Sequence, residues 1–246
     1  MNWLHDALGR LPAPDAGAAQ IARARVDDIL RPRGAFAALD DIAVTIAGWQ
    51  RSTTPRIERP AALIFAADHG VAVASAVSAY PVEVTAAMLA AYSQGKATIN
   101  ALARAVGATV HAVDVGVGRP TGDICIEPAM TQQRFADTVD AAVAAVDALD
   151  TDLLVLGEMG IGNTTVAAAI ASALLDGDAD DWVGRGTGVD DDGLARKRGA
   201  VTAAVERVRG IADPIEVLRE IGGAELVAIA AACVAARLRS IPVVPD

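Results

Sequence analysis

Four short apolar runs and a series of longer helical stretches alternate along most of the chain. The apolar runs are AALIFAA at 61–67, TVHAVDVGV at 109–117, DLLVLGEM at 152–159 and IPVV at 241–244. Their length and their content of branched apolar residues are typical of buried strands. Stretches with helical spacing are at 82–94, 98–107, 135–149, 164–175, 191–208, 213–222 and 224–238. The alternation predicts the α/β class, with a parallel sheet covered by helices on both faces.

The first 60 residues have a different pattern, with no strand-like run. Helices are predicted at 18–30 and 35–50, and a polar, proline-bearing connection covers 51–60. A chain of 246 residues, 53% of them hydrophobic, is long enough for one large domain or for one large domain with a small satellite. We therefore divide the chain into a helical N-terminal segment, 1–60, and an α/β domain, 61–246.

Composition narrows the classes of partner. A formal net charge of −10 argues against nucleic acid or an anionic membrane as the main partner, although it allows a local site for a small anion. The N-terminus has no basic segment followed by an apolar core, and no stretch of about 18 residues lacks charged or amide side chains. We expect a soluble, cytoplasmic protein.

The cysteines and histidines do not form a metal-binding pattern. Cys125 and Cys233 lie far apart in sequence and are expected to be buried free thiols in a reducing compartment. His5, His69 and His111 are scattered and include no HxxxH pair. The sequence therefore predicts neither a metal site nor a cofactor.

The stretch LGEMGIGNTT at 156–165 joins a predicted strand to a predicted helix through closely spaced glycines. Glycines leave backbone N–H groups uncovered, and a helix N-terminus directs more of them the same way, which is an arrangement that binds phosphate and other anions. Asn163, Thr164 and Thr165 can add side-chain donors. The stretch lacks the GK[ST] of a P-loop, which argues against an ATPase. A tight strand–helix turn with a threonine cap is the purely structural alternative.

Two further stretches contain candidate site residues, each with a structural alternative. In VGRGTGVDDDGLARK at 183–197, Arg185 and Lys197 can meet a phosphate or a carboxylate, whereas the aspartates also fit a helix cap. Asp68 and His69 follow the first strand and can form a catalytic pair. Alternatively, Asp68 caps loop amides and His69 is a core histidine.

The sheet class also predicts where these residues meet. In parallel α/β sheets ligands bind beyond the carboxyl ends of the strands, and the loops 68–70, 114–116 and 157–165 satisfy this condition. SAYP at 78–81, followed by Met88 and Tyr92 on one helix face, can line a flat apolar pocket. Core packing explains these two side chains equally well.

These motifs occur together in an order that resembles a known family. AADHGV, SAYPVEVT, INALARAVGATVHAVDVGV, LGEMGIGNTT, VGRGTGVDDDGLARK and DPIEVLREIGG are similar to motifs of the nicotinate-nucleotide–dimethylbenzimidazole phosphoribosyltransferase family of cobalamin synthesis. The resemblance implies a Rossmann-like parallel sheet, a small helical domain built from both chain ends, and a homodimer. It implies that nicotinate mononucleotide gives its 5-phosphoribosyl group to 5,6-dimethylbenzimidazole. The products are α-ribazole 5′-phosphate and nicotinate, formed with inversion at the anomeric carbon and without a metal.

The resemblance also implies roles for individual residues. Glu158 would lie beside the sugar, where a carboxylate accepts ribose hydroxyls or stabilises an oxocarbenium-like centre. The nucleotide phosphate would be held by Gly160, Ile161, Gly162, Asn163 and Thr164. The phosphoribosyl and nicotinate groups would be surrounded by Gly186, Gly188 and Lys197. The benzimidazole pocket would be lined by Ala79, Tyr80 and Met88.

Two differences separate the chain from the family pattern. RPRGAFAALDD at 31–41 stands where the family usually has KPxGSLGxLE. The family also continues beyond IPVV to an LGEGSG-type motif, whose glutamate is its general base, and no residue in 1–246 matches that glutamate. We therefore expect a C-terminally short member or a fragment with slow turnover of its own. The alternative is a catalytically inactive paralogue, or a partner subunit, that binds a nucleotide or an aromatic base. Benzimidazoles, purines and phenols all remain open as the accepted base.

Overall fold

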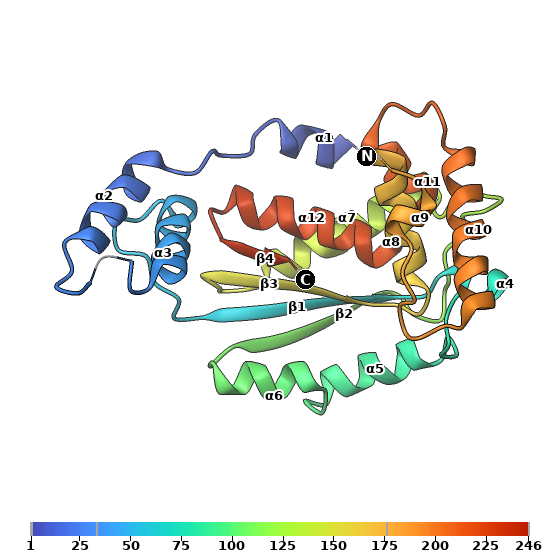
Figure 1. Ribbon diagram of the computed structural model, residues 1–246, viewed down its shortest axis with the longest axis horizontal. Helices are drawn as coiled ribbons and strands as arrows, with labels where there is room; N and C mark the ends of the chain where they lie inside the picture. The colour runs from blue at the N-terminus through green and yellow to red at the C-terminus, as the bar shows by residue number, and fades with distance from the viewer. Residues whose placement is uncertain (1, 33, 176, 246) are drawn as a thin grey trace.

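The computed structural model, which describes residues 2–32, 34–175 and 177–245, contains a four-stranded parallel sheet in the order β2-β1-β3-β4 (Figure 1). The strands are β1 (Pro60–Ala67), β2 (Thr109–Gly116), β3 (Leu153–Met159) and β4 (Val243–Pro245). Each strand lies within one or two residues of its predicted position. All three pairings are parallel, as the alternation of strands and helices predicts.

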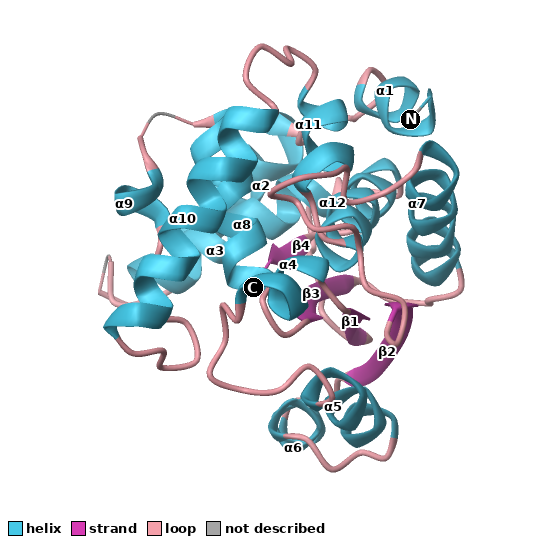
Figure 2. Ribbon diagram, turned by 90° about the vertical axis from the view of Figure 1, so that its right-hand side faces the viewer, coloured by secondary structure: helices cyan, strands magenta, loops and turns pink. Residues whose placement is uncertain are grey.

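Helices cover both faces of this sheet, which confirms the predicted fold class. Figure 2 shows α7 (Gln132–Asp147) and α12 (Ala224–Leu238) on one side of the strands, and α5 (Val84–Ser93) and α6 (Thr98–Ala105) on the other. Alternate residues of β1 face the two layers. Leu63 and Phe65 belong to the core with α12, whereas Ala62 and Ile64 face the layer of α5 and α6.

A third group of helices lies beyond the carboxyl ends of the strands. It consists of α8 (Asn163–Leu174), α10 (Asp191–Arg207) and α11 (Pro214–Ile221), and α8 packs against both others. Asp213 caps α11 by accepting a hydrogen bond from the N–H of Ile215 at 3.0 Å, and Pro214 occupies the first helical position. This group brings α10 next to the start of α8.

The N-terminal helices divide between two places. In α1 (Asn2–Leu8), Leu4 and Ala7 are buried in the main core, where the helix packs on α12. Helices α2 (Ala16–Asp27) and α3 (Ala37–Gln50) pack against each other at the end of the molecule opposite to α10 and α11 (Figure 1). The division of the chain at residue 60 stays a prediction.

Two short helices occupy stretches that the sequence pattern predicts as loops. Helix α4 (Gly70–Ser75) forms because Val71, fully buried, anchors it to the core. Helix α9 (Ala179–Trp182) begins at Asp178, whose carboxylate accepts from the N–H of Asp180 at 2.8 Å. Both are too short to show a helical apolar period. No helix among the described residues is long and apolar enough to cross a membrane.

Candidate active site

The carboxyl ends of β1, β2 and β3 meet at one edge of the sheet, together with the loops that follow them. Phe65 pairs with Glu158, Ala66 with Asp114, and Ala67 with Gly116. The three predicted loops are therefore neighbours, and together they form the candidate site.

The glycine turn, defined as Gly160–Gly162, links β3 to α8 by a tight path. Gly162 has φ +95°, and a Cβ at this position would lie 2.8 Å from Cβ of Ala72. The N–H of Ile161 donates to the buried Thr85 hydroxyl at 3.1 Å, which fixes the turn to α5. The N–H groups of Gly162 and Thr164 have no hydrogen-bond partner in the part of the chain that the structure describes. They are free to bind an anion.

Lys197 on α10 brings a buried positive charge to the same place. Its side chain is 1% exposed, and its Nζ donates to Thr164 Oγ1 and to the carbonyl of Gly184, both at 2.9 Å. Within 2–32, 34–175 and 177–245, no carboxylate forms an ion pair with it. Burial lowers the pKa of this ammonium group, because no neighbouring charge compensates for lost hydration. A buried ammonium beside unpaired N–H groups has the chemistry to bind an anion, so this place is a candidate anion site.

The backbone around Lys197 requires glycine at Gly186. This residue has φ +52°, and a Cβ there would lie 2.9 Å from Lys197 Nζ and 3.1 Å from Thr164 Oγ1. Gly186, Thr164 and Lys197 are thus brought together, while their roles stay predictions. Gly188 also has positive φ, +96°, but a Cβ at this position would meet nothing within 4 Å.

Glu158 connects the anion site to the rest of the cleft. Its carboxylate accepts a hydrogen bond from Asn163 Nδ2, so Asn163 orients Glu158 and its amide is not turned toward an anion. Thr165, the other predicted donor, is fully buried, and its hydroxyl has no hydrogen-bond partner among the described residues. Of the polar side chains in GNTT, only Thr164 touches the buried ammonium.

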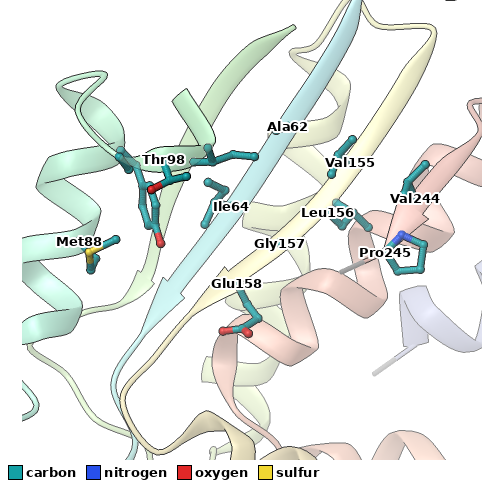
Figure 3. Close-up of a pocket in the computed structure, with 13 residues that line it drawn as sticks. Ala62, Ile64, Met88, Thr98, Val155, Leu156, Gly157, Glu158, Val244 and Pro245 are labelled. Atoms are coloured by element: carbon teal, nitrogen blue, oxygen red, sulfur yellow. The ribbon is translucent and has the colours of Figure 1, made fainter. Parts of the chain in front are cut away.

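A cavity of about 380 Å³ adjoins Glu158 on the face of the sheet that α5 and α6 cover. Figure 3 shows its floor on β1 and β3, Met88 on one side, Val244 and Pro245 on the other, and Glu158 at the end of β3. Burial, and secondarily the Glu158 carboxylate, raise the pKa of Tyr92. The lining residues are Ala62, Ile64, Met88, Tyr92, Ala97, Thr98, Ile99, Val155, Leu156, Gly157, Glu158, Val244 and Pro245. A mostly apolar cavity with one carboxylate suits a flat aromatic base.

Two of the residues predicted to contact the base lie outside this cavity. Ala79 and Tyr80 are on the loop before α5, and Tyr80 is 56% exposed. The N–H of Ala79 donates to Thr187 Oγ1 at 3.3 Å, and Ser78 Oγ is 3.2 Å from the same hydroxyl. Thr187 thus ties this loop to the GRGTG loop. The assignment of Ala79 and Tyr80 to the base stays a prediction.

The side chains of Asp68 and His69 do not pair with each other but have different partners. Asp68 Oδ2 accepts from the N–H of Gly118 at 2.7 Å, so this carboxylate caps a loop as the structural alternative proposed. His69 is fully buried and faces Glu225, with Nε2 3.1 Å from Oε1. Arg185 pairs with Asp191 at 2.6 Å and donates to the carbonyl of Val189 at 3.0 Å.

The expected thiols are only partly as predicted. Cys125 and Cys233 are free, but both are half-buried. Burial and the nearby Asp123 raise the pKa of Cys125 to about 11, so its thiol is un-ionised at neutral pH. No group of three or more His, Cys, Asp or Glu side chains within the described ranges could hold a metal ion.

Sequence reasoning missed two residues of this region, Thr85 and Glu225. Thr85 lies one turn before Met88 on the same helix, and nothing in the sequence marks its hydroxyl as the group that holds the glycine turn. Glu225 is fully buried at the start of α12. Its only signal is a single acid in the first turn of a mostly apolar helix, which the helix dipole also explains.

Comparison with known proteins gives consistent results. A family model described as phosphoribosyltransferase matches residues 11–246. A nicotinate-nucleotide–dimethylbenzimidazole phosphoribosyltransferase of Methylocella silvestris is 47% identical over 100% of this chain and 72% of its own length. A protein of the same name from Ruegeria pomeroyi is 48% identical over 98% of this chain and 71% of its own length. The crystal structure of CobT from Thermus thermophilus superposes with a TM-score of 0.89 at 39% identity, covering 94% of this chain and 74% of that one.

Proposed function

The chain belongs to the phosphoribosyltransferase family, and on that premise we propose that it is a pentosyltransferase acting on nicotinate mononucleotide and 5,6-dimethylbenzimidazole. The benzimidazole nitrogen attacks the anomeric carbon of the nucleotide, the bond to nicotinate breaks, and the nitrogen loses its proton. The products are α-ribazole 5′-phosphate and nicotinate, which belong to the nucleotide-loop branch of cobalamin synthesis.

One observation carries this proposal: a buried lysine, without a carboxylate partner among the described residues, adjoins an apolar cavity through a single glutamate. Lys197 contacts Thr164, Thr164 follows Asn163, and Asn163 donates to Glu158 at the end of the cavity. A substrate with a phosphate at one end and an aromatic ring at the other matches this order of groups. The phosphate meets Lys197 and the N–H groups of Gly162 and Thr164.

Glu158 is then the group beside the ribose. As nicotinate leaves, positive charge develops at the anomeric carbon, and a fixed carboxylate nearby stabilises it. The hydrogen bond from Asn163 holds the carboxylate in one orientation, so little reorganisation is needed during the reaction. Met88 and Tyr92 supply apolar walls for the incoming base.

We predict that residues 1–246 alone bind nicotinate mononucleotide but release nicotinate slowly. Glu158 is the only carboxylate that lines the cavity within the described ranges, and its place beside the sugar suits charge stabilisation better than removal of the acceptor proton. A positioned general base contributes about 10²–10⁴-fold to such a step. The measurement is steady-state nicotinate release with dimethylbenzimidazole, for residues 1–246 and for the same chain extended by a relative's C-terminal segment. We expect the extended chain to be faster by that factor.

Comparable rates for the two chains would show that the acceptor proton goes to a residue already within 1–246. Adenine and phenol, tested beside dimethylbenzimidazole, define the accepted base. The proposed function itself would be contradicted if calorimetry detected no binding of nicotinate mononucleotide and neither chain released nicotinate.

We also propose a homodimer, because large apolar side chains gather on the surface of α2 and α3. Their exposed fractions include 54% for Ile21, 62% for Leu39 and 53% for Ile42. An apolar surface of this kind is typical of a subunit contact. We predict a dimer by light scattering at micromolar concentration, and a monomer for Leu39→Glu. A wild-type chain that stays monomeric over this range would contradict the proposal.

A cytoplasmic location is part of the same proposal. It is supported by the two free cysteines, since unpaired thiols are usual in reducing compartments.

A further inference from the structure

A buried ion pair lies directly under the glycine turn and has no place in the reaction described above. His69 and Glu225 are both 0% exposed, and Nε2 of His69 is 3.1 Å from Oε1 of Glu225. The two residues come from distant parts of the chain, the end of β1 and the first turn of α12. An ionised pair in a core costs free energy unless its surroundings compensate for lost hydration, so its presence there calls for an explanation.

The imidazole lies between two glycines whose backbones approach it closely. A Cβ on Gly160 would lie 2.6 Å from His69 Nε2 and 2.7 Å from the carbonyl oxygen of Ala67. A Cβ on Gly223 would lie 2.5 Å from His69 Cε1 and 2.6 Å from both carboxylate oxygens of Glu225. Neither glycine has a positive φ, so close approach, and not backbone conformation, explains both of them. The ring therefore defines how far the glycine turn can move toward the core.

The charges around the pair favour its ionised form. Glu225 occupies the first turn of α12, where the helix dipole stabilises a negative charge. Glu225 from α12 contacts His69 directly, and the charges of Glu158 from β3 and of the adjacent Asp68 act on it from farther away. Burial lowers the pKa of His69, but these three carboxylates together raise it above its ordinary value. A raised pKa keeps the imidazolium form until the pH exceeds that value, so the ion pair is fully present below about pH 6.5 and is lost above the folded-state pKa.

We propose that His69 and Glu225 are positioning residues for phosphoribosyl transfer: they hold the glycine turn, and with it the free N–H groups, at the distance from Lys197 that a nucleotide phosphate requires. The inference rests on the proposed function. It assigns these residues no contact with the substrate, because both are enclosed by protein. Their effect reaches the ligand through Gly160.

The test uses the single variants Glu225→Gln and His69→Gln and the double variant that combines them. Each change keeps most of the side-chain volume and removes the charge. We expect each single change to weaken binding of nicotinate mononucleotide by about 10–100-fold in calorimetry, since a displacement of roughly 1 Å in a site has effects of this size. The double variant should be no weaker than the worse single one, because the two side chains act as a unit. The KM for dimethylbenzimidazole should change less than twofold.

Glu220→Gln is the matched control. Glu220 accepts hydrogen bonds from Arg207 and Arg219 in another buried network, between α10 and α11. Its loss should lower the melting temperature without changing nucleotide affinity, which separates positioning from general stability. Unchanged affinity in folded Glu225→Gln and His69→Gln would overturn the inference while leaving the proposed function intact. A wild-type chain that binds no nicotinate mononucleotide would overturn both.

The wild-type chain supplies a second measurement in case these variants do not fold. The chain has three histidines, so the His69 ring signal can be followed by NMR as the pH is raised. We expect it to titrate above its ordinary pKa, and to titrate higher still with saturating nicotinate mononucleotide. A pKa that does not change when the nucleotide binds would show that the pair is not coupled to the phosphate site.

Discussion

Lys197→Met should weaken the binding of nicotinate mononucleotide by at least about 100-fold and leave the folded protein no less stable than the wild type. The loss follows from removing the buried ammonium of the proposed phosphate site, where charge-assisted hydrogen bonds each contribute about 1.5–3 kcal/mol. The stability follows from the same burial, because an ammonium group without a carboxylate partner is unfavourable in a core and methionine fills similar space. Calorimetry and thermal unfolding measure the two effects.

The chain offers a matched control, because its only other lysine is the exposed Lys96. Lys96→Met makes the same chemical change on the surface and should alter neither affinity nor stability by much. Inorganic phosphate should raise the melting temperature of the wild type and of Lys96→Met, but not of Lys197→Met, since a ligand stabilises only the state that binds it. Equal stabilisation of all three by phosphate would place the anion elsewhere.

Glu158→Gln should lower kcat by about 10²–10³-fold, the usual cost of removing a fixed group that stabilises transition-state charge. Affinity for nicotinate mononucleotide should change only severalfold, because the amide keeps the shape of the side chain and the phosphate contacts are untouched. Single-turnover measurement of nicotinate release separates the chemical step from binding. The hydrogen bond from Asn163 can still form to the amide oxygen, so the glycine turn should keep its conformation.

Glu83→Gln is the control for this prediction. Glu83 is exposed, directly precedes α5 and does not line the cavity. Its substitution tests whether a lost negative charge near the cleft is enough to slow the reaction. A similar loss of kcat in both variants, or a loss of affinity without a change in kcat for Glu158→Gln, would show that Glu158 has a different role.

The order of elements and the place of the site could be predicted from sequence because both depend on local pattern. Apolar runs bounded by polar loops indicate strands, and parallel strands bring their carboxyl ends to one edge. The loops after β1, β2 and β3 therefore had to be neighbours, and the structure brings Gly186, Thr164 and Lys197 together beside them.

The contacts between distant elements could not be predicted in this way. His69 faces Glu225 and not the adjacent Asp68, because α12 brings a carboxylate to it from a distant part of the chain. Asn163 turns back to Glu158 and not toward an anion, which spacing alone does not decide. Nor does the sequence show that a bulky residue at Gly162 would strain the fold, because only the structure gives its φ of +95° and the nearby Ala72.

The parallel register of the sheet has a consequence for how the chain acquires its structure. Ala61 of β1 pairs with Leu154 of β3, and Leu154 pairs in turn with Val243 of β4. Since ribosomes add about 5–20 residues per second, each strand waits several seconds for its partner to be synthesised. Meanwhile an apolar strand such as β1 has an unpaired edge, which is the condition under which chains associate wrongly. Nascent chains of this protein should therefore depend on chaperones until α12 has emerged and covered the sheet.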